Sequence, residues 1–263
     1  MSNPLDALPF DLDLALPRDG QETELSITFV RGEPDPEDEE ETSLAPCDEV
    51  LHVFSMAQAA RMLSGGANEP RRTVMEPLSR DTPEGGLSWM YRFRVREIEP
   101  ASFLVLLALL AQTKYAYAPL AAVAITASER GGSLMTAGKL LGLPREVARV
   151  GAPPFAVERA QSLSRKRCVV TFRFRDPVSP AGFQEIAELL NLWDHLAVLG
   201  GFLFDFQEQE EMPPFGEPAH VAPRVIEHRV RLYDGHESGF DALVNLGAAL
   251  HAGGRPLVAI EVE

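Results

Sequence analysis

Three segments of the chain share one pattern: a strand in which arginine alternates with apolar residues, a turn, and an apolar helix that opens near a phenylalanine. The strands start at Phe93, Phe172 and His228, and the phenylalanines are Phe103, Phe183 and Phe240. A fainter copy over residues 25–78 precedes them, which makes four. A strand–helix–strand unit repeated an even number of times is typical of a split βαβ arrangement.

The four units predict an α+β protein built from two tandem ferredoxin-like (βαββαβ) halves. Each half is expected to be a four-stranded antiparallel sheet with its helices on one face. The expected parts are an irregular N-terminal arm (1–21), a first half (22–128) with an acidic loop (33–49), a connector (129–165) and a second half (166–263). A single sheet or barrel shared by both halves is the alternative arrangement.

Two local expectations follow from residue spacing. Ser55 has the character of an N-cap, and apolar residues at helical spacing follow it up to Leu63, so a helix is expected there. Phe202, Phe204 and Phe206 alternate with other residues after Gly200-Gly201, which predicts the return strand of the third unit.

The charge is strongly acidic and unevenly distributed. The net charge is −15, yet residues 130–175 carry ten basic residues against Glu146 and Glu158. An acidic chain disfavours broad binding to nucleic acids or anionic membranes, because both need a positive contact surface. A basic protein partner is favoured instead, and a second copy of the chain is a further candidate.

Cysteine usage and hydropathy predict a cytoplasmic protein. Cys47 and Cys168 are too few for a disulfide framework, and no metal-binding spacing joins them. The longest apolar run, 103–111, is about half the length of a membrane span. The first residues show no basic segment followed by an apolar one, so no signal peptide is expected. No metal or other cofactor is predicted.

The outward arginines of the second half are the first candidate site. In a ferredoxin-like half the first and third strands are central, so Arg173 and Arg175 are expected beside Arg229 and Arg231. Guanidinium groups bind oxyanions in a bidentate manner, so this set predicts a platform for an anion or an acidic partner. The alternative is a solvated face paired with Asp205, Glu261 and Glu263.

The acidic loop is the second candidate. Its residues Glu37, Asp38, Glu39, Glu40 and Glu41 follow two prolines, which favours a solvated segment over a helix or strand. Such a segment can occupy a basic groove of a partner protein. It lacks the Asp-x-Asp-x-Asp-Gly spacing of a calcium loop.

One turn brings together residue types suited to proton transfer. Asp234, His236 and Glu237 lie between a predicted strand and helix, where they form either a general-base site or turn and cap interactions. No nucleophile elbow or zinc-protease motif is present. The sequence therefore favours a non-catalytic protein without excluding an enzyme.

Residues 172–186 (FRFRDPVSPAGFQEI) resemble the opening of an ACT domain, with a strand, an acidic–Pro–Gly turn and a helix. The resemblance implies a ferredoxin-like fold and amino-acid binding at the turn. Val178 and Ser179 lengthen that turn relative to the family pattern, and the fourth unit shares only Gly239-Phe240.

The prediction from the sequence is a non-catalytic binding protein, similar to immunity or inhibitor proteins, that acts on another macromolecule through a charge-polarised surface. One alternative is a regulatory protein that senses a small molecule through the turns at 176–182 and 234–239. The other is an enzyme with a site near Asp234 and His236.

Overall fold

The computed structural model shows a mixed α+β protein with two β-sheets. The residues that it describes are 7–17, 22–32, 45–63, 74–81, 88–96, 99–113, 119–128, 134–160, 167–206, 216–231, 233 and 235–263. Every structural statement below refers to these residues.

The first sheet has six strands in the order β3-β4-β2-β5-β1-β6. Its strands are β1 (Asp11–Pro17), β2 (Thr23–Arg31), β3 (Val74–Asp81), β4 (Ser88–Arg96), β5 (Leu120–Ala127) and β6 (Leu134–Thr136). All neighbours are antiparallel except β1 and β5, which are parallel. Helix α1 (Ala45–Ala59) connects β2 to β3, and α2 (Phe103–Gln112), preceded by the short 3-10 helix Pro100–Ser102, connects β4 to β5.

The second sheet has five strands in the order β7-β11-β8-β10-β9. Its strands are β7 (Ala156–Arg159), β8 (Arg167–Phe174), β9 (Pro218–Ala222), β10 (Val225–Arg231) and β11 (Leu257–Val262). Only β7 and β11 pair in parallel. Helix α4 (Pro180–Val198) follows β8, and α5 (Gly239–Ala252) follows β10; the short α3 (Ala137–Leu140) lies between the two sheets in sequence.

The alternation of apolar residues and arginine determines which face of each sheet is buried. Along β4, Tyr91, Phe93 and Val95 are buried whereas the intervening arginines are exposed, as expected from a period of two. In β8, Phe172 and Phe174 are buried in the same way. Helix α4 opens near Phe183, as expected: Pro180 is its first residue, and the Ser179 hydroxyl accepts a hydrogen bond from the Gly182 amide.

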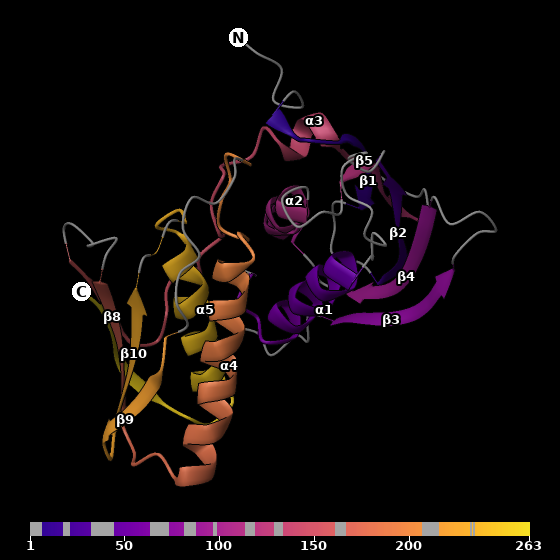
Figure 1. Ribbon diagram of the computed structural model, residues 1–263. Coiled ribbons are helices and arrows are strands. Elements are labelled where there is room, and N and C mark those ends of the chain that lie inside the picture. Colours follow the sequence, from indigo (N-terminus) through magenta and orange to yellow (C-terminus); the bar gives the residue numbers. More distant parts are fainter. Residues whose placement is uncertain are drawn as a thin grey trace.

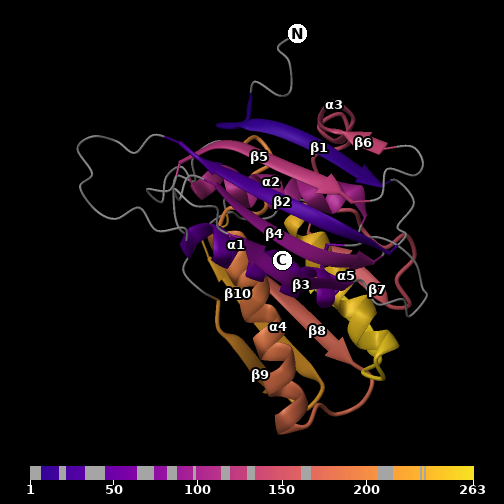
Figure 2. The same ribbon diagram turned by 90° about the vertical axis from the view of Figure 1, so that its right-hand side faces the viewer.

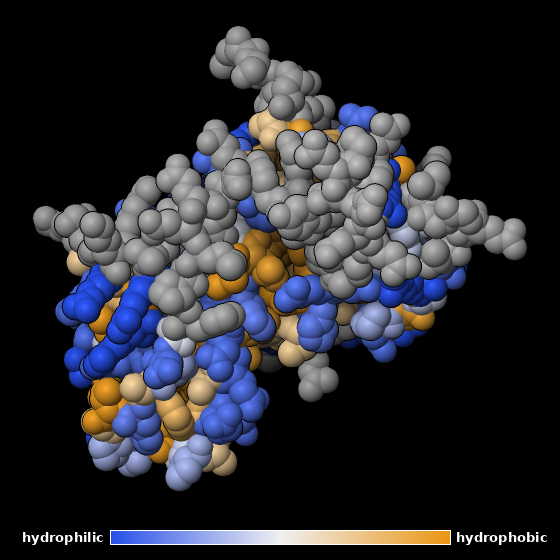
Figure 3. All heavy atoms as spheres, viewed as in Figure 1, coloured by the Kyte–Doolittle hydropathy of each residue, from blue (hydrophilic) through white to orange (hydrophobic). Residues whose placement is uncertain are grey.

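The helices of the two sheets pack against one another, so the molecule has a sheet–helix–helix–sheet arrangement (Figure 1). Every residue of α2 from 103 to 111 is buried, which requires cover on more sides than one sheet provides. Figure 3 shows hydrophobic residues at the centre of the view, where these helices meet.

Glycines in the turn after α4 allow this turn to approach α2 closely. A Cβ on Gly201 would lie 3.2 Å from Leu109 Cδ2, and one on Gly200 would lie 2.5 Å from Gln112 Cγ. Gly200 also has a φ of +75°, in the left-handed region that favours glycine.

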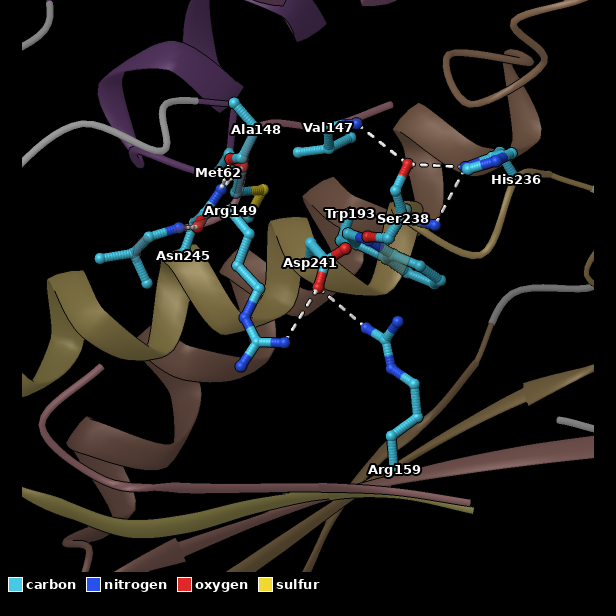
Figure 4. Close-up of polar contacts among 12 residues, drawn as sticks. Met62, Val147, Ala148, Arg149, Arg159, Trp193, His236, Ser238, Asp241 and Asn245 are labelled. Atoms are coloured by element: carbon cyan, nitrogen blue, oxygen red, sulfur yellow. Dashed lines mark hydrogen bonds and ion pairs between the residues drawn. The ribbon is translucent and has the colours of Figure 1, made fainter. Parts of the chain in front are cut away.

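Asn245 of α5 joins three segments at the junction of the helix layers (Figure 4). Its side-chain amide donates to the carbonyl oxygens of Met62 and Ala148, at 3.0 and 2.8 Å, and its Oδ1 accepts from the Val150 amide at 2.8 Å. The bonds to Met62 and Val150 are buried, so they satisfy backbone groups that water cannot reach, and the bond to Ala148 is part-buried.

The expectation of two four-stranded antiparallel sheets is wrong in strand number, because the sheets have six and five strands, and each sheet also contains one parallel pair. The additional strands come from segments for which other structures were expected. Part of the predicted irregular arm forms β1, and the predicted connector contributes β6, α3 and β7. Strand β1 carries the period-2 pattern, with Leu14 and Leu16 buried, and pairs with the edge of β5.

Two local expectations are also wrong. Helix α1 begins at Ala45, not Ser55, so the end of the predicted acidic loop is helical; residues 33–44 lie outside the described part of the chain. Residues 202–206 form turns, and the strand that follows α4 is β9. Phe202, Phe204 and Phe206 are nevertheless buried, so burial and not strand pairing explains their alternation.

Replacement of Asn245 by alanine tests the junction. Asn245→Ala leaves the Val150 amide and the carbonyl groups of Met62 and Ala148 without these partners, so we expect a loss of about 2–4 kcal/mol in the free energy of unfolding. Urea denaturation measures this quantity. Asn191→Ala on the exposed side of α4 is the control, and an equal effect of both variants would contradict the assigned role of Asn245.

Candidate functional site

The four predicted arginines of the second sheet do not form one cluster. Antiparallel pairing places Arg173 opposite Val225, and Arg231 opposite Arg167 at the other end of the strands. Arg175 follows the end of β8, where its backbone amide donates to the Pro256 carbonyl. The expected neighbourhood of Arg173 and Arg175 with Arg229 and Arg231 is therefore wrong, because the strand direction separates the two pairs.

Glutamates of the same sheet face accompany these arginines. The Arg173 guanidinium forms a bidentate ion pair with Glu261 on the adjacent strand, with Nη2 2.9 Å from Oε2, and Arg229 lies 3.2 Å from Glu227. The hydrogen bond from the Arg173 side chain holds the pKa of the Glu261 carboxyl below the ordinary glutamate value. The pairing with Glu261 agrees with the alternative of a solvated, charge-paired face.

The uncovered face of the second sheet is balanced in charge. Among its described strands and the C-terminal residue, four arginines face four glutamates: Arg167, Arg173, Arg229 and Arg231 against Glu158, Glu227, Glu261 and Glu263. A balanced face gives little long-range attraction to an anion.

The uncovered face of the first sheet carries an excess of negative charge. Its arginines pair with acidic neighbours: Arg92 with Asp81 at 3.5 Å, Arg94 with Glu76 at 3.5 Å, and Arg96 with Glu22 at 2.7 Å. The register adds further carboxylates, so six face three guanidinium groups; the acids are Asp11, Asp13, Glu22, Glu24, Glu76 and Asp81.

A trough of about 710 Å³ crosses this face beside β1. Two rows of paired residues form it: Asp11–Ala122–Val30 and Asp13–Ala124–Thr28. Alanines on the central strand are short, so they form the floor, while the aspartates stand along one side. Both aspartates are exposed and have no ion pair within the described part of the chain. In Figure 2 this face of β1, β5 and β2 is turned toward the viewer.

The predicted acidic-loop residues cannot be placed relative to the trough. Glu37, Asp38, Glu39, Glu40 and Glu41 lie outside the described residues, so their role stays a prediction.

The turn before α5 holds His236 in a defined orientation (Figure 4). Its Nδ1 accepts a hydrogen bond from the Ser238 amide at 3.2 Å and lies 2.8 Å from the Ser238 hydroxyl. The Ser238 oxygen in turn accepts from the Val147 amide at 2.9 Å. Because a backbone N–H always donates, Nδ1 must be the unprotonated nitrogen, and Nε2 carries the proton of the neutral ring.

These contacts describe a structural turn more than a catalytic dyad. Ser238 is 5% exposed, and its oxygen is engaged by Val147, so it is poorly placed to attack a substrate. Glu237 is exposed, Asp234 lies outside the described residues, and Arg229 lies on the uncovered sheet face, away from the helices that His236 precedes. Among the described residues, the convergence of these groups that an enzyme site would require is thus not observed.

Neither cysteine has the properties of a nucleophile. Both are buried, and burial raises the pKa of the Cys47 thiol to about 12 and that of Cys168 to about 11. Thiolates are the reactive form, so both side chains are expected to be inert near neutral pH.

Sequence reasoning missed a buried His–Asp pair. His228 of β10 and Asp194 of α4 are 0% and 4% exposed, with Nε2 2.9 Å from Oδ1. The second polar atom of each side chain, His228 Nδ1 and Asp194 Oδ2, has no hydrogen-bond partner among the described residues. The available signal was the position of His228 in the apolar phase of β10, between buried Ile226 and Val230.

Arg145 is a second residue that sequence reasoning missed. This residue lines a pocket together with His236 and the turn after α4, and its Nη1 donates to the Phe204 carbonyl at 3.1 Å. Three segments distant in sequence form the pocket, and no local pattern signals that they meet.

Comparison with known proteins does not assign the chain to a family. No protein-family model and no curated protein matches it. In the described ranges, no helix combines the length and apolar character that a membrane crossing requires, and no group of three or more His, Cys, Asp or Glu side chains could hold a metal ion.

The ion pair between Arg173 and Glu261 provides a test of the charge-paired face. In Arg173→Gln we expect the pKa of Glu261 to rise toward the ordinary glutamate value, as measured by side-chain NMR titration. The pKa is lowered in the folded state, so the stabilisation is present above the unfolded-state pKa and is lost as pH falls through the folded-state pKa. Arg175→Gln is the control, and an unchanged Glu261 pKa in Arg173→Gln would contradict the pairing.

Proposed function

We propose that this protein is a non-catalytic binding protein, similar in mode of action to immunity or inhibitor proteins, that takes a basic segment of a partner protein on the uncovered face of the first sheet. The excess of six carboxylates over three guanidinium groups on that face carries the proposal. Such an excess attracts a basic surface and orients its approach.

The trough adds an apolar contribution to binding, which charge alone does not provide. Its floor at Ala122 and Ala124 is uncharged and shallow, so an apolar side chain of the partner can be buried there. Asp11 and Asp13 stand beside the floor without ion pairs among the described residues, so Lys or Arg next to that apolar residue would find unpaired carboxylates. An apolar centre with a polar rim is the usual anatomy of a protein interface.

Self-association through the same face is disfavoured by its charge. Two copies would each bring six carboxylates and three guanidinium groups, so both faces would be negative. Like-charged faces repel, and the proposed partner is therefore a different, basic protein.

The proposed architecture is a pair of ferredoxin-like halves over 22–128 and 166–263, each enlarged by at least one strand. Support comes from the neighbours β5-β2-β4-β3 in the first sheet and β11-β8-β10-β9 in the second, all of which pair antiparallel. In each half the two helices then cover one face and leave the other available for binding.

Capture experiments with charge variants test the proposal. Immobilised wild-type protein is incubated with soluble proteins of the native host, and bound proteins are quantified by mass spectrometry. We expect basic partners that are bound at 0.1 M salt and released at 1 M, where the Debye length falls from about 10 Å to about 3 Å. The double variant Asp11→Asn/Asp13→Asn should lose them, and Ala124→Phe should weaken their binding by filling the trough.

The control removes two exposed acids from the second half, in Asp176→Asn/Glu188→Gln, and should retain the partners. Equal capture by the Asp11→Asn/Asp13→Asn and control variants, or binding that is insensitive to salt, would rule out this face as the binding site.

A further inference from the structure

A second pocket lies on the helix side of the second sheet. The residues that line it are distant in sequence from those of the trough. Its volume is about 330 Å³, within the range of small-molecule sites. Arg145 lies on one side, the turn 202–205 forms the apolar wall, and Gly235 and His236 complete it.

Arg145 presents unused hydrogen-bond donors at this pocket. One of its terminal nitrogens donates to the Phe204 carbonyl, and the guanidinium carbon lies 5.3 Å from the centre of the Phe206 ring. These contacts fix the side chain, which is half-buried and has no ion pair in the described structure. Within the described residues the remaining N–H groups of the guanidinium fork have no partner, so they can bind a carboxylate in a bidentate manner.

His236 contributes a second donor. Its ring is held through Nδ1 by Ser238, and the Phe204 ring meets it edge-on with centroids 5.8 Å apart. Its backbone amide donates to the Phe202 carbonyl at 2.9 Å, which ties the two turns together. With Nδ1 engaged as an acceptor, the exposed Nε2–H remains available as a donor.

The wall of the pocket is a strained turn. Phe206 adopts a φ of +59°, which is uncommon for a bulky residue, and its amide donates to the Leu203 carbonyl at 3.1 Å. Non-glycine residues in this conformation cluster at ligand sites, where surrounding contacts hold them. Here the strained turn holds Phe204 and Phe206 against His236 and Arg145, respectively.

From this geometry we infer a binding site for a small organic monocarboxylate with an apolar group. The carboxylate lies between Arg145 and the Nε2–H of His236, and the apolar group lies against the Phe202–Phe204 wall. Asp205 lines the rim and disfavours a more highly charged anion such as inorganic phosphate. The inference stands apart from the proposed function, because none of the trough residues takes part.

Benzoate and its neutral analogue benzamide test the site. Titration of the ¹⁵N-labelled protein should give saturable chemical-shift changes at the Gly235 and His236 amides with benzoate, and much smaller ones with benzamide or inorganic phosphate. Arg145→Gln should raise the benzoate dissociation constant at least tenfold, or about 1.4 kcal/mol. Arg145→Lys, which keeps the charge but not the planar fork, should bind with intermediate affinity.

Arg224→Gln, an exposed arginine in the β9–β10 turn, is the matched control and should bind benzoate like the wild type. Circular dichroism establishes that each variant is folded, and His236→Gln provides a second variant if Arg145→Gln does not fold. Absence of saturable binding, equal binding of benzoate and benzamide, or full affinity in the folded variant would overturn the inference.

Discussion

The burial of α2 between the two sheets is the constraint on which the rest of the structure depends. A helix whose residues 103–111 are all buried cannot be covered by one sheet, so the second half must add cover: the turn after α4 contacts α2, and α4 itself packs on α1. Gly200 and Gly201 permit that approach, and Asn245 satisfies the backbone groups that the junction buries. Because the two helix layers cover each other, only the outer faces of the sheets remain available for recognition of a partner.

The two outer faces differ in charge, and this difference separates the proposed interaction surface from a merely solvated one. On the uncovered face of the second sheet, arginines and glutamates are equal in number, and Arg173 forms an ion pair with Glu261. On the uncovered face of the first sheet the carboxylates outnumber the arginines, and Asp11 and Asp13 flank an uncharged floor. The pocket at Arg145, on the helix side of the second sheet, is proposed to bind an anion, whereas the first-sheet face is proposed to bind a basic partner.

The sequence predicted those structural features that depend on neighbouring residues, such as strand alternation and the start of a helix. The alternation in β4 and β8, and the opening of α4 near Phe183, depend on neighbouring residues alone, and the structure confirms both. Strand partners were harder, because β1 and β7 are parallel additions whose pairing depends on distant strands. Phe202, Phe204 and Phe206 alternate because a tight turn buries every second residue, and this pattern resembles that of a strand. Antiparallel neighbours were expected, but the residue-by-residue register that separates Arg173 from Arg229 was not readable from the sequence.

Hydrogen exchange of the backbone amides in α2 and α4 tests the common helix core most directly. If the two helix layers form one core, the slowest amides of both helices exchange only through global unfolding. Their opening free energies then agree with each other and with the unfolding free energy from denaturation. Exchange of α4 amides through a lower-energy opening, while α2 remains protected, would show that the sheets with their helices unfold separately and would contradict the account.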